Sequence, residues 1–359
     1  MKNVIRMLGV AASFALASSM AMADSISPST YSTTLGIGES VTITKTVVIS
    51  KGSPTSALVD VKFIADTTGS MGGINSTVKS NATAIMSGLS GFGDAQFGAS
   101  EYKDRFDSYT TKVNQALTSD TSAVQAGINA WGASGGGDTP EANLIALKQQ
   151  AEATDWREGS NRFIVQFGDA PGHEGGDYPT LANTITALND NNVKVIVVGT
   201  SAMNNTCAYE GNNCTGNAAT TIATSTGGSF NLISSGADID QLIKDAIGDS
   251  FATYSNVSLG LVGSSGGVGV SFNPVSYTGS WDRSEDRVFT FDVTFTGIAA
   301  GTFDFGVGAF VDGGRVALET DSITVAAAPV SSVPLPGALP MLLGALGVSG
   351  SFLRRRRRG

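Results

Sequence analysis

Hydroxyl and carboxylate oxygens recur at alternate positions directly after one apolar run of the sequence. Residues 58–65 are rich in Val, Ile and Phe, which predicts a buried strand, and Asp66, Thr68 and Ser70 follow it. One turn of backbone can aim these three oxygens at one point, and hard oxygen ligands suit Mg²⁺, Mn²⁺ or Ca²⁺ rather than Zn²⁺ or copper. Taken alone, the same pattern also fits a helix cap or an Asx turn.

Two further segments place oxygen ligands in comparable positions. Residues 135–141 read GGGDTPE and precede a helical pattern over 142–151. Residues 163–173 form a second buried-strand pattern that passes into a loop at Asp169. Open α/β sheets bind ligands at the carboxyl ends of their strands. The three segments together therefore favour one shared metal site over three separate turns.

Three such loops in this order resemble the von Willebrand factor A domain and its metal-ion-dependent adhesion site. The likeness spans roughly residues 57–250. It implies a doubly wound, mostly parallel α/β sheet of Rossmann-like type, with Mg²⁺ or Mn²⁺ at the adhesion site. The metal ligands that it implies here are Asp66, Thr68, Ser70, Thr139, Glu141 and Asp169.

The resemblance is closer to the integrin β-subunit version of this domain. Residues 138–141, DTPE, look like its Asp-x-Pro-Glu stretch, and residues 97–105 look like its second-strand region. The likeness implies a neighbouring Ca²⁺ site. Gly136 stands where that family has Asn, and residues 71–73 contain no acid, so a third site is not expected. The oxygens of the Ca²⁺ site would come from Asp104, Asp138, the Pro140 carbonyl and Glu141.

The N-terminus reads as an export signal. Lys2 and Arg6 precede an apolar stretch over 7–17, and residues 21–23 form a small-x-small cleavage site before Asp24. This is the pattern of a secretory signal peptide over residues 1–23. The alternative is an N-terminal membrane anchor.

The C-terminus carries a second signal. Residues 333–338 read VPLPGA, residues 339–353 are apolar, and Arg354–Arg358 follow. The apolar stretch is shorter than the ~20 residues a spanning helix prefers. Segment 333–359 resembles the PEP-CTERM family of bacterial sorting signals in its VPLPA variant, with Gly337 in place of Ala. The resemblance implies an exosortase-type processing enzyme, transient contact with the inner membrane, and a Gram-negative host. A plain tail anchor is the alternative.

Charge and cysteine content agree with export. The chain has 22 basic and 31 acidic residues, and loss of both signals removes only basic ones. Such an acidic body disfavours nucleic acid and anionic lipid as partners. Cys207 and Cys214 are the only cysteines, and in an exported protein they predict a disulfide. His173, the single histidine, is expected to be a surface or hydrogen-bonding group rather than a catalytic one.

The rest of the chain divides into segments of different pattern. Helical and strand patterns alternate over 57–250, whereas 254–327 is rich in strand and turn patterns and predicts a small antiparallel β-sandwich. The N-terminal β segment 24–56 contains an alternating strand at 41–49. We expect this strand to join the sandwich, so that the α/β domain is an insertion; a tethered arm is the alternative. Residues 328–332 read as a linker.

Three classes of function fit these features. The first is a cell-surface, outer-envelope or matrix protein that binds an acidic protein or polysaccharide, with a partner carboxylate completing the shell of the metal. The second is a structural surface or matrix component that uses the metal for stability. The third, a metal-dependent hydrolase, is disfavoured because Ser70 has no histidine activator and would already be a metal ligand. We therefore expect a binding protein and not an enzyme.

Overall fold

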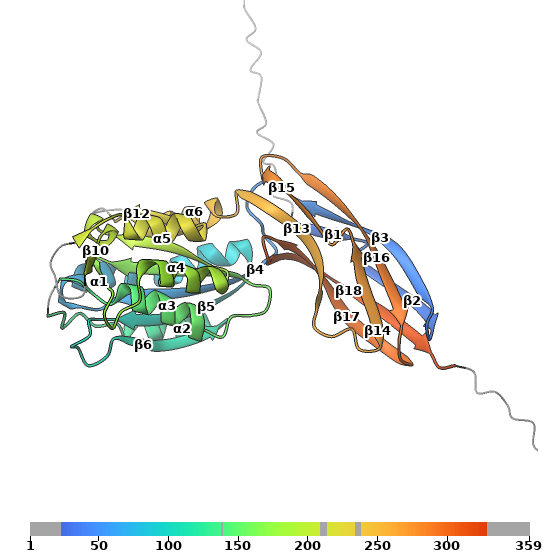
Figure 1. Ribbon diagram of the computed structural model, residues 1–359, viewed down its shortest axis with the longest axis horizontal. Coiled ribbons are helices and arrows are strands. Elements are labelled where there is room, and N and C mark those ends of the chain that lie inside the picture. Colours follow the sequence, from blue (N-terminus) through green and yellow to red (C-terminus); the bar gives the residue numbers. More distant parts are fainter. Residues whose placement is uncertain (1–22, 138, 209–213, 234–237, 329–359) are drawn as a thin grey trace, which may run out of the picture.

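The computed structural model describes residues 23–137, 139–208, 214–233 and 238–328, which form two domains side by side (Figure 1). One is an α/β domain and the other is built of two β-sheets. This confirms the predicted fold class. The N-terminal signal before Ala23 and the tail after Ala328 lie outside the described residues, so the export signals stay predictions. Among the described residues, no helix is long and apolar enough to cross a membrane.

The α/β domain contains a six-stranded sheet with the order β12-β9-β7-β4-β5-β6. All neighbouring strands are parallel except β6, which runs antiparallel to β5 at one edge. The strands are β4 (Ala57–Asp66), β5 (Gly93–Tyr102), β6 (Thr111–Thr118), β7 (Asn161–Gly168), β9 (Val193–Gly199) and β12 (Ser229–Leu232).

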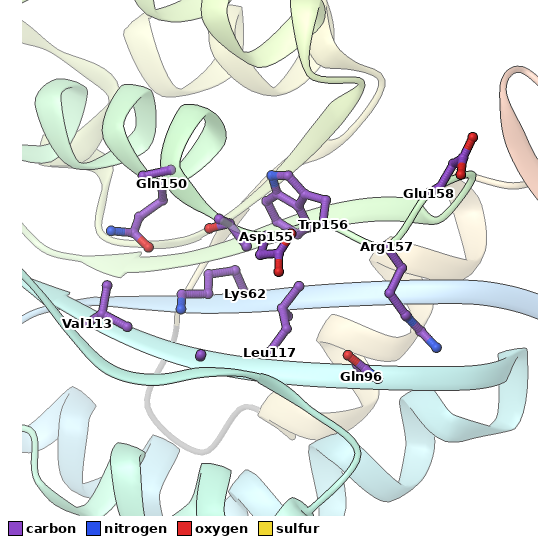
Figure 2. A pocket seen from close by; sticks show the side chains of 12 residues that line it. Lys62, Gln96, Val113, Leu117, Gln150, Asp155, Trp156, Arg157 and Glu158 are labelled. Atoms are coloured by element: carbon purple, nitrogen blue, oxygen red, sulfur yellow. The ribbon is translucent and has the colours of Figure 1, made fainter.

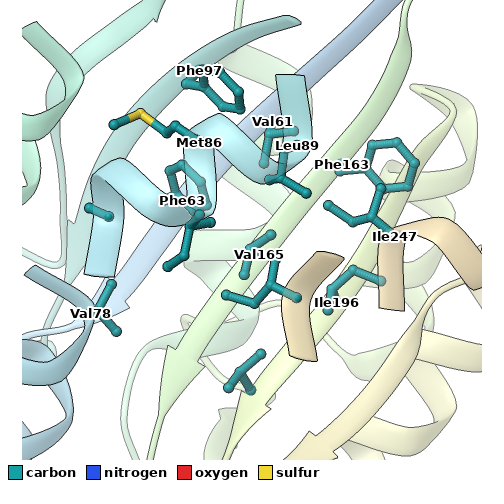
Figure 3. Close-up of a cluster of buried hydrophobic side chains, with 14 of the residues drawn as sticks. Val61, Phe63, Val78, Met86, Leu89, Phe97, Phe163, Val165, Ile196 and Ile247 are labelled. Carbon is teal, nitrogen blue, oxygen red and sulfur yellow. The ribbon is translucent and has the colours of Figure 1, made fainter. Parts of the chain in front are cut away.

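Helices cover both faces of this sheet. On one face, residues of α1, α2 and α6 pack on β4, β5, β7 and β9, and Figure 3 shows Phe63, Met86 and Ile247 in this cluster. Residues of α3, α4 and α5 form the core of the other face. The helices are α1 (Gly72–Leu89), α2 (Thr121–Asn129), α3 (Asn143–Ala153), α4 (Leu181–Asp190), α5 (Ala218–Thr226) and α6 (Ile239–Asp249).

Strand β4 is buried along its whole length because both of its faces are covered. Val61 and Phe63 belong to the core cluster on one face, while Ile64 belongs to the cluster on the other. Alternate side chains of a strand point to opposite faces, so a central parallel strand reads as a mostly apolar run, interrupted here by Asp60 and Lys62. This explains why the run before Asp66 is so clear in the sequence.

The β domain consists of two packed sheets with the orders β1-β3-β16-β14 and β15-β13-β17-β18-β2. Their inner faces share one core. The β2–β18 pair is parallel, which departs from the expected antiparallel sandwich. The strands are β1 (Ser25–Ser27), β2 (Thr30–Gly36), β3 (Ser40–Ile49), β13 (Thr253–Val262), β14 (Val268–Asn273), β15 (Ser276–Asp282), β16 (Arg287–Gly297), β17 (Gly301–Val311) and β18 (Gly314–Ala326).

The N-terminal segment is part of the β domain. Strand β3 pairs with β16 from Ser40 opposite Thr296 to Ile49 opposite Arg287. The α/β domain is therefore inserted between β3 and β13. At the junction, Arg283 donates to both carboxylate oxygens of Asp24 at 2.9 and 2.8 Å and to the Ser50 carbonyl at 3.1 Å. These bonds hold the chain where it leaves the β domain.

A small third sheet lies beside the carboxyl edge of the α/β domain. It contains β8 (Gly172–Glu174), β10 (Thr206–Ala208) and β11 (Cys214–Thr215) in the order β11-β10-β8. Cys207 is paired directly opposite Cys214 in the backbone register. Directly opposed antiparallel residues are at a backbone spacing that a disulfide can span. The cysteine side chains lie outside the described part of the structure, so the disulfide stays a prediction.

Candidate metal centre

The three loops singled out in the sequence meet at one edge of the α/β sheet. Strands β4 and β7 are parallel neighbours, so the residues after Asp66 and after Gly168 emerge side by side. The loop before α3 joins them, because Glu141 forms an isolated parallel bridge with Gly172. A cavity of about 400 Å³ lies between the loops, and it is lined by Thr68, Gly69, Ser70, Gly135, Gly136, Thr139, Glu141, Asp169 and Ala170.

Asp66 lies behind Thr68, which is one of the residues that line this cavity. Its side chain is fully buried, and its Oδ1 accepts hydrogen bonds from the backbone N–H of Thr68 at 2.8 Å and from the Thr68 hydroxyl at 2.7 Å. Its Oδ2 is buried and has no hydrogen-bond partner among the described residues. Burial raises the pKa of Asp66 to about 6 despite the two Thr68 hydrogen bonds, and the nearby Asp169 charge adds to the rise.

Ser70 connects the first loop to the third. Its hydroxyl donates to Asp169 Oδ1 at 3.0 Å. Both side chains line the cavity, so a hydroxyl oxygen and a carboxylate oxygen from different strand ends lie within contact of each other. Such a pair offers a divalent cation one neutral and one charged oxygen ligand.

Glu141 brings a third carboxylate to the cavity. Its backbone is fixed, since its N–H donates to the Pro171 carbonyl at 2.9 Å and its carbonyl accepts from the His173 N–H at 3.0 Å. Its Oε2 is buried without a hydrogen-bond partner in the described part of the chain. Burial raises the pKa of Glu141 to about 9, with further increases from the charges of Asp66 and Asp104. Neighbouring carboxylates disfavour one another's charged form, so their charges add to the effect of burial on the pKa.

No ion pair balances the charge of this cluster in the described chain, although the Lys103 charge favours ionised Asp66. None of the ion pairs there includes Asp66, Glu141 or Asp169. Lys103 lies nearby, but its Nζ donates to the backbone carbonyls of Thr67, at 2.6 Å, and of Ser134. The carboxylates are therefore left for a cation from outside the chain.

Gly136, which departs from the integrin pattern, is explained by the geometry of the cavity. Its φ is +76°, and a Cβ atom there would lie 2.8 Å from Thr68 Cβ and 2.9 Å from Glu141 Oε1. A side chain at this position would displace two of the proposed ligands. Glycine is therefore required by the close approach of the loop to the cavity.

The sequence reasoning missed Asp107. Its Oδ2 accepts hydrogen bonds from the backbone N–H of Gly136 at 2.9 Å and of Asp104 at 3.3 Å. Asp107 therefore holds the backbone of loop 135–137, which precedes the proposed ligands Thr139 and Glu141. A short acidic side chain three residues after Asp104, with glycines at 135–137, was the available signal.

The residues proposed for the second metal site are only partly described. Asp138 lies outside the described residues. Asp104 Oδ1 accepts a hydrogen bond from the Tyr178 hydroxyl at 3.1 Å and lies 3.1 Å from His173 Nε2. Pro140 precedes the Glu141 bridge and is buried. The Ca²⁺ site stays a prediction.

His173 occupies a different environment from a surface group. Its side chain is buried, stacks on the Tyr178 ring with centroids 4.7 Å apart, and faces Asp104. It is thus a buried core residue beside a carboxylate, and the expectation of a surface group is wrong. The sequence could not show this burial, because strand β8 is too short to give an apolar pattern.

The donor set of the cavity fits a hard divalent cation. In the described ranges no group of three or more His, Cys, Asp or Glu side chains lies close enough to hold a metal ion by itself. The Thr68 and Ser70 hydroxyls line the cavity beside the Glu141 and Asp169 carboxyl groups. The unpartnered oxygens of Asp66 and Glu141 are the observation that supports this fit. Hydroxyl and carboxylate oxygens are typical of Mg²⁺ and Mn²⁺ sites.

A second cavity lies on the α3 face of the sheet, away from this edge. Figure 2 shows Lys62 and Trp156 among the side chains that line its volume of about 510 Å³. Lys62 is 2% exposed, and its Nζ donates to the Gln115 carbonyl at 3.0 Å. Gly98 opposite it leaves room for the lysine, since a Cβ there would lie 3.0 Å from Lys62 Cδ. Burial lowers the pKa of Lys62 to about 8.

Comparisons with known proteins bear on the α/β domain. Residues 60–234 match the family model described as von Willebrand factor A domain. The alpha-protein kinase vwkA of Dictyostelium discoideum is 28% identical over 144 residues, which are 39% of this chain and 23% of the kinase, so the match spans about a quarter of that protein.

Two solved bacterial structures are also similar. A von Willebrand factor type A protein from Catenulispora acidiphila has a TM-score of 0.44 and 16% identity, over 84% of this chain and 73% of that one. The conserved hypothetical protein BatB from Bacteroides thetaiotaomicron has a TM-score of 0.39 and 15% identity, over 54% of this chain and 98% of that one. On the strength of the family match, residues 60–234 form a von Willebrand factor A domain.

Proposed function

We propose that this protein is an exported surface or matrix protein that binds an acidic partner through a divalent metal held at the carboxyl edge of its α/β sheet. One observation carries the proposal: Asp66 Oδ2 and Glu141 Oε2 are buried without hydrogen-bond partners in the described chain, beside a cavity lined by hydroxyls. A buried carboxylate oxygen without a partner is costly. A bound cation would remove that cost.

Different residues of the chain would supply the charged and the neutral ligands of the metal. Asp66 and Asp169 supply charge, directly or through water, and Thr68 and Ser70 supply neutral oxygens. Thr139 or Glu141 completes the protein shell on the side of the glycine loop. Mg²⁺ or Mn²⁺, when bound, supplies a Lewis-acidic centre that keeps exchangeable waters. The cavity leaves room for a carboxylate from a protein or polysaccharide partner.

The location of the protein and the second metal rest on the sequence signals. The signal peptide, the acidic body and the VPLPA-type tail support export through an exosortase-type pathway to the cell surface, outer envelope or matrix. The proposed Ca²⁺ site of Asp104, Asp138, Pro140 and Glu141 would lie next to the first site, since the Asp104 charge acts on Glu141. Binding, rather than catalysis, is the activity proposed for this surface.

Calorimetric titration of the metal-stripped protein with Mg²⁺ tests the function. Saturable binding is expected for the wild type and should be absent in Asp66→Asn, while Asp304→Asn, which changes an exposed carboxylate of the β domain, should bind as the wild type does. Retention of acidic polysaccharide or envelope protein on the immobilised chain should require Mg²⁺. If Mg²⁺ binds and stabilises but no retention depends on it, the metal is structural and the binding function is wrong.

A further inference from the structure

A second buried charge cluster lies inside the β domain, far from the metal site in sequence and in fold. Lys45 of β3, Glu319 of β18 and Asp321 of β18 all have side chains that are 0% exposed. They face one another across the two sheets of the sandwich, because β3 and β18 belong to different sheets. Fully buried lysine and carboxylates are rare, so the cluster requires an explanation.

The lysine nitrogen touches both carboxyl groups. Lys45 Nζ lies 3.1 Å from Asp321 Oδ1 and 3.0 Å from Asp321 Oδ2, and it is in contact with Glu319 Oε1. Since its distances to the two Asp321 oxygens are nearly equal, the nitrogen contacts both oxygens of this carboxyl group. Glu319 and Asp321 are two residues apart on one strand, so they point to the same side.

The surroundings are apolar and aromatic. Lys45 Nζ lies 5.9 Å from the centre of the Phe295 ring, which stacks on Tyr31 and packs against Phe305. Burial raises the pKa of Glu319 to about 7 and also raises the pKa of Asp321. Two carboxylates and one ammonium in such a site carry a net negative charge that water cannot reach. A buried ion cluster of this kind is a weak contributor to stability and costs much in desolvation.

We propose that Lys45 and Asp321 condense to an isopeptide bond, with Glu319 as the catalytic acid and base. Overall, the ammonium and the carboxylate become one amide and one water, so charge and atoms balance and no oxidant or cofactor is needed. Nζ forms a bond to Asp321 Cγ, and one C–O bond of that carboxyl group breaks. Two protons pass one after the other from the nitrogen through Glu319 to the departing oxygen, which leaves as water, and Glu319 ends in its starting state.

The position of the bond in the topology gives it a mechanical role. Lys45 and Asp321 are 276 residues apart, and the whole α/β domain lies between them. A bond there joins the strand before the inserted domain to the last strand of the β domain. Load on the α/β domain would then pass from both of its connections into β18 through a covalent link. This inference goes beyond the metal-dependent function and does not depend on it.

The mass of the folded, full-length protein tests the inference directly. After reduction of the cysteines, the intact wild-type chain should be lighter than its sequence by one water. A protease digest should contain a branched peptide, with fragment ions that locate the branch at Lys45 and Asp321. An intact mass equal to the sequence mass, or a branch at any other pair, would overturn the proposal.

Substitutions separate the roles of the three residues. Lys45→Arg should abolish the mass loss, whereas Lys51→Arg, at an exposed lysine near the end of β3, should keep it. Glu319→Gln should fold without the bond, and its mass should equal its sequence mass. Asp321→Asn should lose one ammonia in place of one water, because the leaving group has changed. A full mass loss of one water in Glu319→Gln would contradict the role given to Glu319.

Discussion

The two domains each bury a cluster of carboxylates, and the clusters differ in what faces them. In the α/β domain, Glu141 lines a cavity of about 400 Å³ and Asp66 lies behind its Thr68 wall, and neither makes an ion pair in the described chain. In the β domain, Glu319 and Asp321 contact Lys45, and all three side chains are fully buried. The first cluster is open to an external cation, and the second already contains an internal one.

Burial has the same effect on both clusters. It raises the pKa of Asp66 to about 6, of Glu141 to about 9 and of Glu319 to about 7. The difference lies in how the charge can be relieved. An accessible cavity lets a metal ion and a partner approach, whereas a sealed site leaves only the lysine. For this reason we propose reversible binding at the cluster of the α/β domain and covalent cross-linking at the cluster of the β domain.

Removal of the internal cation should have the largest effect. Lys45→Met leaves two carboxylates buried without a counter-ion and removes the cross-link, so we expect a loss of at least about 3 kcal/mol in the free energy of unfolding. Urea denaturation followed by tryptophan fluorescence measures this loss. Lys51→Met is the matched control and should change stability by less than about 0.5 kcal/mol. Equal stability of the two variants would show that the β cluster holds no essential cation.

Lys62 is buried without an ion-pair partner in the described chain, so its charge should destabilise the folded state, whereas Lys45 should stabilise it. The pKa of Lys62 falls to about 8 from 10.5 because of burial, so its charge opposes folding fully below pH 8. The wild type should gain about 3 kcal/mol of stability between pH 8 and pH 10.5 relative to Lys62→Met, as the folded state loses this proton first. Denaturation curves of both proteins at several pH values give the difference. A difference that stays constant over this range would show that Lys62 is not desolvated.

Removal of Asp66 should abolish the response of the open cluster to metal. In Asp66→Asn the apo protein should be at least as stable as the wild type, because an uncompensated buried charge is removed. The wild type, however, should gain about 2.7 kcal/mol at a Mg²⁺ concentration of 100 times its Kd, and the variant should gain none. Thermal unfolding with Mg²⁺ and with chelator measures both. A metal-dependent gain retained in the variant would remove Asp66 from the site.

The glycine loop should respond to a side chain at one position and not at the next. Gly136→Asn places a Cβ against Thr68 and Glu141 at φ +76°, so we expect a loss of about 1–2 kcal/mol and weaker Mg²⁺ binding. Gly137→Asn is the matched control, since nothing lies within 4 Å of a Cβ there. Unfolding and titration of both variants measure the effect. Equal behaviour would show that Gly136 does not set the shape of the cavity.

Much of the α/β domain could be predicted from the sequence because its signals are local. The central strand reads as a mostly apolar run before Asp66, and helix α1 follows it over Gly72–Leu89. Strand β6 gives little sequence signal because it is a polar, partly exposed edge strand, and helix α5 gives little because it is a short run rich in Ala and Thr. Prediction from sequence depends on periodic apolar residues that mark a buried face, and these two elements contain few of them.

The loops of the candidate site could be predicted from the sequence, but the contacts between their side chains could not. Asp66, Thr68, Ser70, Thr139, Glu141 and Asp169 could be named because each follows a strand or precedes a helix. The role of Asp107 and the burial of His173 depend on contacts between loops that are far apart in sequence. The Lys45 cluster was missed for the same reason, since Lys45 and Glu319 meet only through sheet packing.

Anomalous diffraction from crystals grown with Mn²⁺ tests the central claim most directly. The claim is that the open acidic cluster takes up an external divalent cation while the sealed cluster does not. It predicts an anomalous peak in the cavity, within coordination distance of Ser70 and of the Asp66 or Asp169 carboxylate, and none beside Glu319. Absence of a peak in the cavity at millimolar Mn²⁺, with the cavity open to solvent in the crystal, would contradict it.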